Sequence, residues 1–97
     1  MKLVIGIIKP FKLDEVCDSL SNMNIQEINV ADVKGFGQQK GLKEHYHGAE
    51  FFVDFFNKIR LEVTVSDEQL AQTVATIQCV AHSGEIGDGK IFVCGIN

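Results

Sequence analysis

The sequence has little basic charge and no long apolar run. It carries 9 basic against 13 acidic side chains, for a formal net charge of −4, and the basic residues form no stripe. This balance disfavours nucleic acid as the main partner, because binding a phosphate backbone needs clustered Lys and Arg. No apolar stretch approaches the roughly 20 residues that a membrane-spanning helix requires. Hydrophobic residues still make up 45 % of the chain, which is enough for a packed core.

Cysteines are few, and their spacing suggests no pairing. Cys17, Cys79 and Cys94 are odd in number and far apart, with no Cys-x-x-Cys motif. We therefore predict reduced thiols in a cytoplasmic protein. The start, MKLVIGIIKP, faintly resembles a secretion signal. It is too short, and no small-residue cleavage site follows, so we interpret it as a strand.

Catalytic patterns are also missing. No order of His, Asp and nucleophile suggests a triad, and each cysteine falls in a predicted helix or strand, where Cys usually acts as a small buried hydrophobe. A phosphate-cleaving enzyme of the acylphosphatase kind needs an arginine in a phosphate loop. The single arginine, Arg60, lies within a predicted strand instead. The sequence thus favours a non-enzymatic protein, with a small phosphate-cleaving enzyme as the less favoured alternative.

What the chain does contain is a regular order of strand and helix signals. The clearest strand is residues 59–65, where apolar and polar side chains alternate strictly. Ser66 and Gln69 form a capping box ahead of a helical apolar stripe, and Gly84 stands where a left-handed C-cap would follow. Predicted strands cover residues 2–8, 25–33, 59–65 and 90–96, and predicted helices cover 10–23 and 70–81.

This order predicts an α+β fold, a ferredoxin-like βαββαβ sandwich with an antiparallel sheet and both helices on one face. We expect residues 1–97 to form a single domain. The other face of the sheet needs a cover, and a homo-oligomer is the usual solution in so small a domain.

Residues 35–57 separate the two middle strands, whereas a typical hairpin loop has roughly 2–5 residues. The insert begins with GFGQQKG, whose three glycines can turn backbone amides toward an anion. A second glycine-rich stretch, Gly84 to Lys90, can form a similar nest with the Lys90 charge beside it. From spacing alone, an ordinary turn before the last strand is the commoner explanation of that stretch.

Two histidines in the insert are candidate metal contacts. His45 and His47 are spaced i, i+2, so on an extended segment both rings face the same way. Two ligands in one loop do not make a metal site, and plain exposed loop residues are the commoner explanation.

Four stretches, taken together and in this order, resemble the PII nitrogen-regulatory signal proteins. They are IIKPFKLDEV (7–16), VKGFGQQKG (33–41), GAEFFVDF (48–55) and GEIGDGKIFV (84–93). The resemblance runs through all 97 residues. It implies a homotrimer with its sheets packed inward and nucleotide sites in the clefts between subunits, where ATP and ADP compete. It also implies that residues 35–57 are a mobile loop that docks into transporters, enzymes or regulators.

The resemblance further implies roles for individual residues. Against the phosphates would lie Gly35, Phe36, Gly37 and Gln38 on one side and Gly87, Asp88, Gly89 and Lys90 on the other. Adenine and ribose would be lined by Ile7, Asn29, Glu62 and Thr64. Gln39 would contact both ATP-bound Mg²⁺ and 2-oxoglutarate, and Lys58 would pair with that oxo-acid.

The chain also departs from the family pattern. Gln38 and His82 stand where the family often has Arg, and Glu85 puts a negative charge beside the predicted phosphate site. The family continues into a segment with two arginines on the phosphates, whereas this sequence ends at Asn97. We therefore expect a C-terminally shortened, divergent member with a weaker grip on phosphate. Phe51 replaces the tyrosine that the family modifies, so we expect no modification there.

The sequence thus predicts a cytoplasmic allosteric regulator that senses adenine nucleotides. Its partner would be a protein such as a membrane transporter or an enzyme of nitrogen metabolism, reached through the loop at residues 35–57. The alternative is a divergent sensor of another small ligand or a metal linked to transport, with His45 and His47 as contacts. A slow nucleotide-hydrolysing enzyme is the less favoured alternative.

Overall fold

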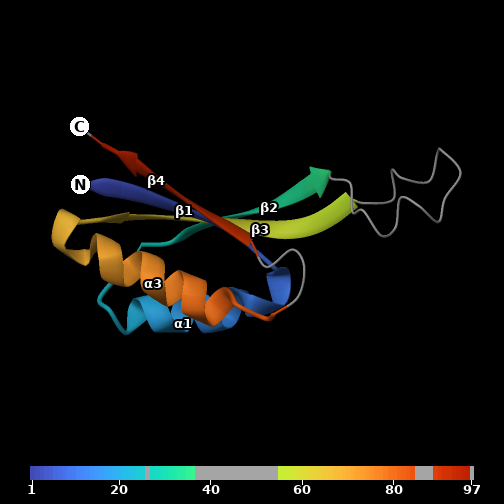
Figure 1. The fold of residues 1–97 in the computed structure, drawn as a ribbon, viewed down its shortest axis with the longest axis horizontal. Coiled ribbons are helices and arrows are strands. Elements are labelled where there is room, and N and C mark those ends of the chain that lie inside the picture. Colours follow the sequence, from blue (N-terminus) through green and yellow to red (C-terminus); the bar gives the residue numbers. More distant parts are fainter. Residues whose placement is uncertain (26, 37–54, 85–88, 97) are drawn as a thin grey trace, which may run out of the picture.

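A computed structural model describes residues 1–25, 27–36, 55–84 and 89–96 of the chain (Figure 1). Its elements, in chain order, are β1 (Lys2–Ile8), the 3-10 turn η1 (Pro10–Lys12), α1 (Leu13–Ser21), β2 (Asn29–Phe36), β3 (Phe55–Val65), the 3-10 turn η3 (Asp67–Gln69), α3 (Leu70–Ala81) and β4 (Gly89–Gly95). Within these ranges no helix is long and apolar enough to cross a membrane.

The strands form one antiparallel sheet in the order β2-β3-β1-β4. Both helices lie against the same face of this sheet, as Figure 1 shows. We call that side the helix face and the opposite side the far face. This arrangement confirms the predicted α+β, ferredoxin-like fold, with β1 and β3 in the middle of the sheet and β2 and β4 at its edges.

The core lies between the helices and the helix face. Alternate residues of the middle strands point into it, because side chains on a strand alternate between the two faces. On β3, every second residue from Ile59 to Val65 is at most 6 % exposed. The helices complete the core with Val16 and Leu20 from α1 and with Ile77 and Ala81 from α3.

Local capping fixes where the second helix starts. The Gln69 amide donates to Ser66 Oγ at 3.2 Å, and the Ser66 amide donates to Gln69 Oε1 at 3.5 Å, so the predicted capping box is confirmed. The predicted position of the C-cap is wrong. Helix α3 ends at Ala81, and its C-cap residue His82 has an extended backbone. Gly84 takes its positive φ of 84° two residues after His82.

Several predicted boundaries also shift. Strand β2 begins at Asn29, and Ile25 is instead a buried residue before the strand. Strand β3 begins at Phe55, because the β2–β3 ladder continues as far as the pair Phe36–Phe55. The described ends of the predicted loop 35–57 therefore belong to strands, and residues 37–54 lie outside the described ranges.

Candidate functional site

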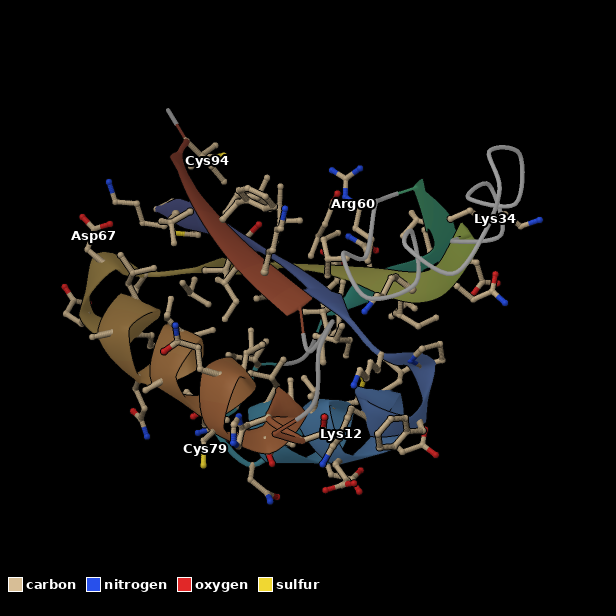
Figure 2. The ribbon with its side chains drawn as sticks, turned by 45° about the vertical axis from the view of Figure 1, so that its right-hand side comes forward. Lys12, Lys34, Arg60, Asp67, Cys79 and Cys94 are labelled. Atoms are coloured by element: carbon tan, nitrogen blue, oxygen red, sulfur yellow. The ribbon has the colours of Figure 1, made fainter. Side chains whose placement is uncertain are left out.

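The predicted site residues that the structure describes with side chains share the far face, apart from the glycine at the start of β4. The set is Ile7, Asn29, Lys58, Glu62, Thr64 and Lys90, and the sheet register gives its placement. Leu61 and Val63 are buried against the helices, so their neighbours on β3 must face the other way. Figure 2 shows the labelled Arg60 projecting from this far side.

The register divides these residues into two groups. Ile7 lies opposite Lys90 on the β1–β4 side, whereas Asn29 lies opposite Glu62 on the β2–β3 side. Strands β2 and β4 are the two edges of the sheet. Three strand spacings of about 4.8 Å, or about 14 Å, therefore separate Lys90 from Asn29 across the sheet. Ile7 and Glu62 lie between them on the neighbouring middle strands, where Ile7 pairs with Arg60 and Glu62 with Ile5.

The β1–β4 group begins at a position that only glycine can occupy. Gly89 has a φ of +133°, a conformation that other residues rarely adopt. A Cβ there would overlap the backbone carbonyl oxygen of Ile7. The close approach sets the start of β4 against the end of β1 and places Lys90 directly across from Ile7.

A pocket of about 300 Å³ adjoins this group, between the end of α3 and the ends of β1 and β4. Its described lining is Ile7, Ile8, Ile77, Gln78, Ala81, His82, Gly89, Lys90 and Ile91. The sequence singled out Ile7, Gly89 and Lys90 as ligand contacts. It missed Gln78 entirely, because a glutamine on an exposed helix position carries no local signal of a pocket.

A side-chain hydrogen bond holds the segment that leads from α3 toward β4. The Lys9 ammonium donates to Ser83 Oγ at 3.1 Å, in a partly buried setting. Lys9 follows β1 and Ser83 follows α3, so the bond joins parts of the chain that are 74 positions apart. No local pattern in the sequence indicates this contact.

On the β2–β3 side, an ion pair occupies the far face. Arg60 Nη2 lies 2.6 Å from Glu62 Oε2, with the two side chains 44 % and 29 % exposed. The residues are two positions apart on one strand and so share a face, a spacing that could have predicted the pair. The Glu62 carboxylate is an acceptor suited to the amino and hydroxyl groups of a nucleoside.

Lys58 belongs to a different hollow. It lines a pocket of about 480 Å³ at the end of the β2–β3 pair, together with Pro10, Asp32, Val33, Lys34 and Asn57. Lys58 and Lys34 bring two positive charges to this pocket, and Asp32 brings one negative charge. Its predicted companion Gln39 lies outside the described residues, so the predicted oxo-acid site is represented here by Lys58 alone.

Other predicted residues are placed only in part. Gly35 and Phe36 are the last two residues of β2, and their backbones pair with Phe56 and Phe55. Outside the described residues lie Gly37, Gln38, Gln39, His45, His47, Phe51, Glu85, Gly87 and Asp88. In the part of the chain that is described, no group of three or more His, Cys, Asp or Glu side chains could hold a metal ion.

The three cysteines are free thiols in different settings. Cys79 is exposed on α3, and Cys94 is exposed on β4, on opposite sides of the molecule in Figure 2. Burial raises the pKa of the Cys17 thiol, and the nearby carboxylates of Asp14 and Asp18 raise it further. Cys17 therefore holds its proton more tightly than a free thiol does.

The strand order and the two helices define a small α+β domain of ferredoxin-like topology. The chain matches the family described as Nitrogen regulatory protein P-II over residues 1–97, and it belongs to that family. It is 53 % identical to a nitrogen regulatory protein P-II of Pasteurella multocida over 93 residues, which cover 96 % of this chain and 83 % of the relative. The nitrogen regulatory protein GlnK of Escherichia coli K12 is 50 % identical over the same length and coverage.

A third relative, a nitrogen regulatory protein P-II of Bradyrhizobium diazoefficiens, is 48 % identical over 96 residues, which cover 99 % of this chain and 86 % of that protein. Membership places the chain among regulators of nitrogen signalling. The family is a regulatory one, which implies regulated protein partners.

Proposed function

We propose that this protein is a non-enzymatic sensor that binds ATP or ADP between copies of itself in a homotrimer. The observation that carries the proposal is the placement of its predicted nucleotide contacts across one open face of the sheet, from Lys90 on edge strand β4 to Asn29 on edge strand β2. Those two outer contacts stand about 14 Å apart, and a second copy laid on this face would bring its own contacts to each of them. A site between subunits joins the Lys90 group of one copy to the Glu62 group of the next.

The chemistry of the two groups supports a nucleotide. Gly84 and Gly89 both have positive φ, a conformation that lets a backbone amide turn toward an anion, and Lys90 supplies the positive charge. The Glu62 carboxylate and the Asn29 side chain offer hydrogen bonds for base and sugar. Ile7, half-buried between them on β1, offers an apolar surface for the adenine ring.

The composition of the far face supports assembly. Leu3, Ile5 and Ile7 bring an apolar row along β1, and Phe92, 50 % exposed, lies beside Ile5 on β4. An apolar surface of this kind gains stability when a second copy covers it. The trimer would thus bury the far face and complete the nucleotide site in the same step.

The regulatory step would pass through residues 35–57. In this proposal ATP-bound Mg²⁺ and 2-oxoglutarate engage Gln39 and Lys58, and the ligand state selects a loop conformation that a partner recognises. The partner would be a transporter or an enzyme of nitrogen metabolism in the cytoplasm. This part of the proposal is supported by family membership and by the pocket that Lys58 lines.

Calorimetric titration tests the proposal. ATP, ADP, AMP and cyclic nucleotides are titrated with and without Mg²⁺ and 2-oxoglutarate, and sedimentation measures the oligomeric state. Lys90→Met should weaken ADP binding roughly tenfold or more, because a charge-assisted bond to phosphate is worth about 1.5–3 kcal/mol. Lys12→Met removes an equal charge on η1, away from the predicted contacts, and should leave ADP binding near wild type. Absence of adenine-nucleotide binding at millimolar concentration would refute the proposal.

A further inference from the structure

The segment between α3 and β4 is held at both of its described ends by the end of β1. At one end, Ser83 accepts the hydrogen bond from the Lys9 ammonium at 3.1 Å. At the other end, Gly89 packs so closely on the carbonyl of Ile7 that no side chain fits. Both anchor points on β1 lie within three residues of each other. The end of β1 therefore sets where this segment leaves α3 and where it enters β4.

The Lys9 contact is unusual for a lysine. Lysine side chains are usually solvated, and fixing one costs rotamer entropy. Here the backbone is prepared for the contact. Lys9 precedes Pro10, which disfavours helical backbone, and it has the extended φ of −70° and ψ of 141°. The side chain is thereby directed from a fixed backbone position at the end of β1.

The residues next to the two anchors have the chemistry of an anion site. Gly84, next to Ser83, has a φ of +84°, and Lys90, next to Gly89, carries the positive charge. An anion held by both ends needs a defined distance between them, since hydrogen bonds weaken steeply when geometry is lost. A contact that fixes one end therefore contributes to affinity without touching the ligand.

We propose that Lys9 and Ser83 form a clasp that holds Gly84 in position relative to Lys90 for binding the phosphates of a nucleotide. This inference rests on the nucleotide-binding function proposed above. Lys9 and Ser83 are positioning residues in it, and they act as one unit. Loss of either partner removes the same hydrogen bond, so losing both adds nothing further.

A double-mutant cycle measures this coupling. The variants are Lys9→Met, Ser83→Ala and the pair together, with ADP, AMP and adenosine as probes in calorimetry. Each single variant should weaken ADP binding by about 3- to 10-fold, a part of the strength of a charge-assisted hydrogen bond. The double variant should be no weaker than the weaker single. Adenosine, which has no phosphate, should bind all variants alike.

Two controls separate the clasp from other effects. Ser83→Thr keeps the hydroxyl and should restore ADP affinity to within about 2-fold of wild type. Lys12→Met removes the same charge three residues away, on η1, and should leave the ADP-to-adenosine ratio unchanged. That ratio is the key readout. A purely structural role would lower the melting temperature of a variant and leave the ADP-to-adenosine ratio unchanged.

Three results would overturn the clasp. Ser83→Ala binding like wild type while Lys9→Met is weak would mean that Lys9 acts on the ligand directly. Additive losses would mean that the two residues act independently, and unchanged ADP-to-adenosine ratios would leave the contact structural only. A wild-type protein that binds no nucleotide would refute the proposed function and the clasp together, whereas normal binding by every variant refutes the clasp alone.

Discussion

The two faces of the sheet differ in the polarity and the burial of their side chains. On β3 the helix face is uniformly apolar, and every second residue from Ile59 to Val65 is nearly inaccessible. The far face of the same strand is polar and carries the Arg60–Glu62 ion pair. One strand thus separates the two tasks of the molecule. Its helix face packs into the core, and its far face carries the polar residues that we propose as ligand contacts.

Strand β1 departs from this division. It is apolar on both faces, with Val4 and Ile8 buried against the helices and Ile5 and Ile7 half-buried on the far side. A strand that is apolar on both faces is typical of a sheet that is covered on both. The far face thus combines an apolar row on β1, which suits the proposed association, with a polar row on β3, which suits the proposed ligand contacts.

The largest effect should come from the helix face. Leu61→Ala removes a side chain that is 0 % exposed, and such truncations cost about 2–5 kcal/mol. Thr64→Ala, three residues along the same strand and exposed on the far face, should stay within about 0.5 kcal/mol of wild type. Urea unfolding at low protein concentration measures both. Equal losses at the two positions would contradict the division of β3 into a core face and a recognition face.

A smaller effect is expected at the glycines of the β1–β4 pair. Gly89→Ala must relieve an overlap with the Ile7 carbonyl and a φ of +133°, at a cost of roughly 1–3 kcal/mol. Gly6→Ala is the matched control. A Cβ at Gly6 would make ordinary contacts of 3.5 Å with Leu61 and 3.6 Å with Ile77, so that variant should be nearly neutral. Unfolding free energies that rank the two variants in reverse would overturn this account.

The sequence predicts those structural features that depend on residues close together in the chain. The boundaries of β1 and α3, the alternation on β3 and the Ser66 capping box depend on neighbouring residues, and they were predicted correctly. The start of β3 at Phe55 stays open in the sequence, because FFVDFF could prolong the strand but does not alternate, and its pairing is set by β2. The fold class follows from the order of elements alone.

The site was predictable in its residue types and less so in its arrangement. The glycines and Lys90 carry a local phosphate signal, and Ile7 came only from the family resemblance. Their adjacency depends on the register of β1 against β4, which joins the two ends of the chain. The Lys9–Ser83 contact spans 74 positions and has no local signature, so only the folded chain reveals it.

The labelling rates of the cysteines can show whether the far face is covered while the helix side stays open. Cys94 lies on the far face, opposite Leu3, and Cys79 lies on α3. If copies cover the far face, iodoacetamide should label Cys94 several-fold more slowly in the assembled protein than in a diluted, dissociated sample. Cys79 should label equally in both. Peptide mass spectrometry reads each site, and equal rates at Cys94 in the two samples would argue against a covered far face.

Cys17 serves as the internal reference in that experiment. Burial and two carboxylates raise its pKa, so less of it is thiolate at neutral pH, and the thiolate is the reactive form. Cys17 should be the slowest of the three to label, and its labelling should keep accelerating as the pH rises above the ordinary range of a thiol. Labelling at Cys17 as fast as at exposed Cys79 at pH 7 would contradict the raised pKa.

The smallest expected effect is at the far-face ion pair. It tests whether assembly covers the polar residues of β3 as well as the apolar row of β1. An exposed pair usually contributes about 0–1 kcal/mol, and Arg60 is 44 % exposed. In dissociated chains, a cycle of Arg60→Met and Glu62→Gln should therefore give a coupling below about 1 kcal/mol. In the assembled protein the same cycle should give a larger coupling, because covering the far face lowers the dielectric around the pair. Equal coupling in the two states would mean that the pair stays in water, and that assembly covers the apolar row of β1 while leaving β3 open.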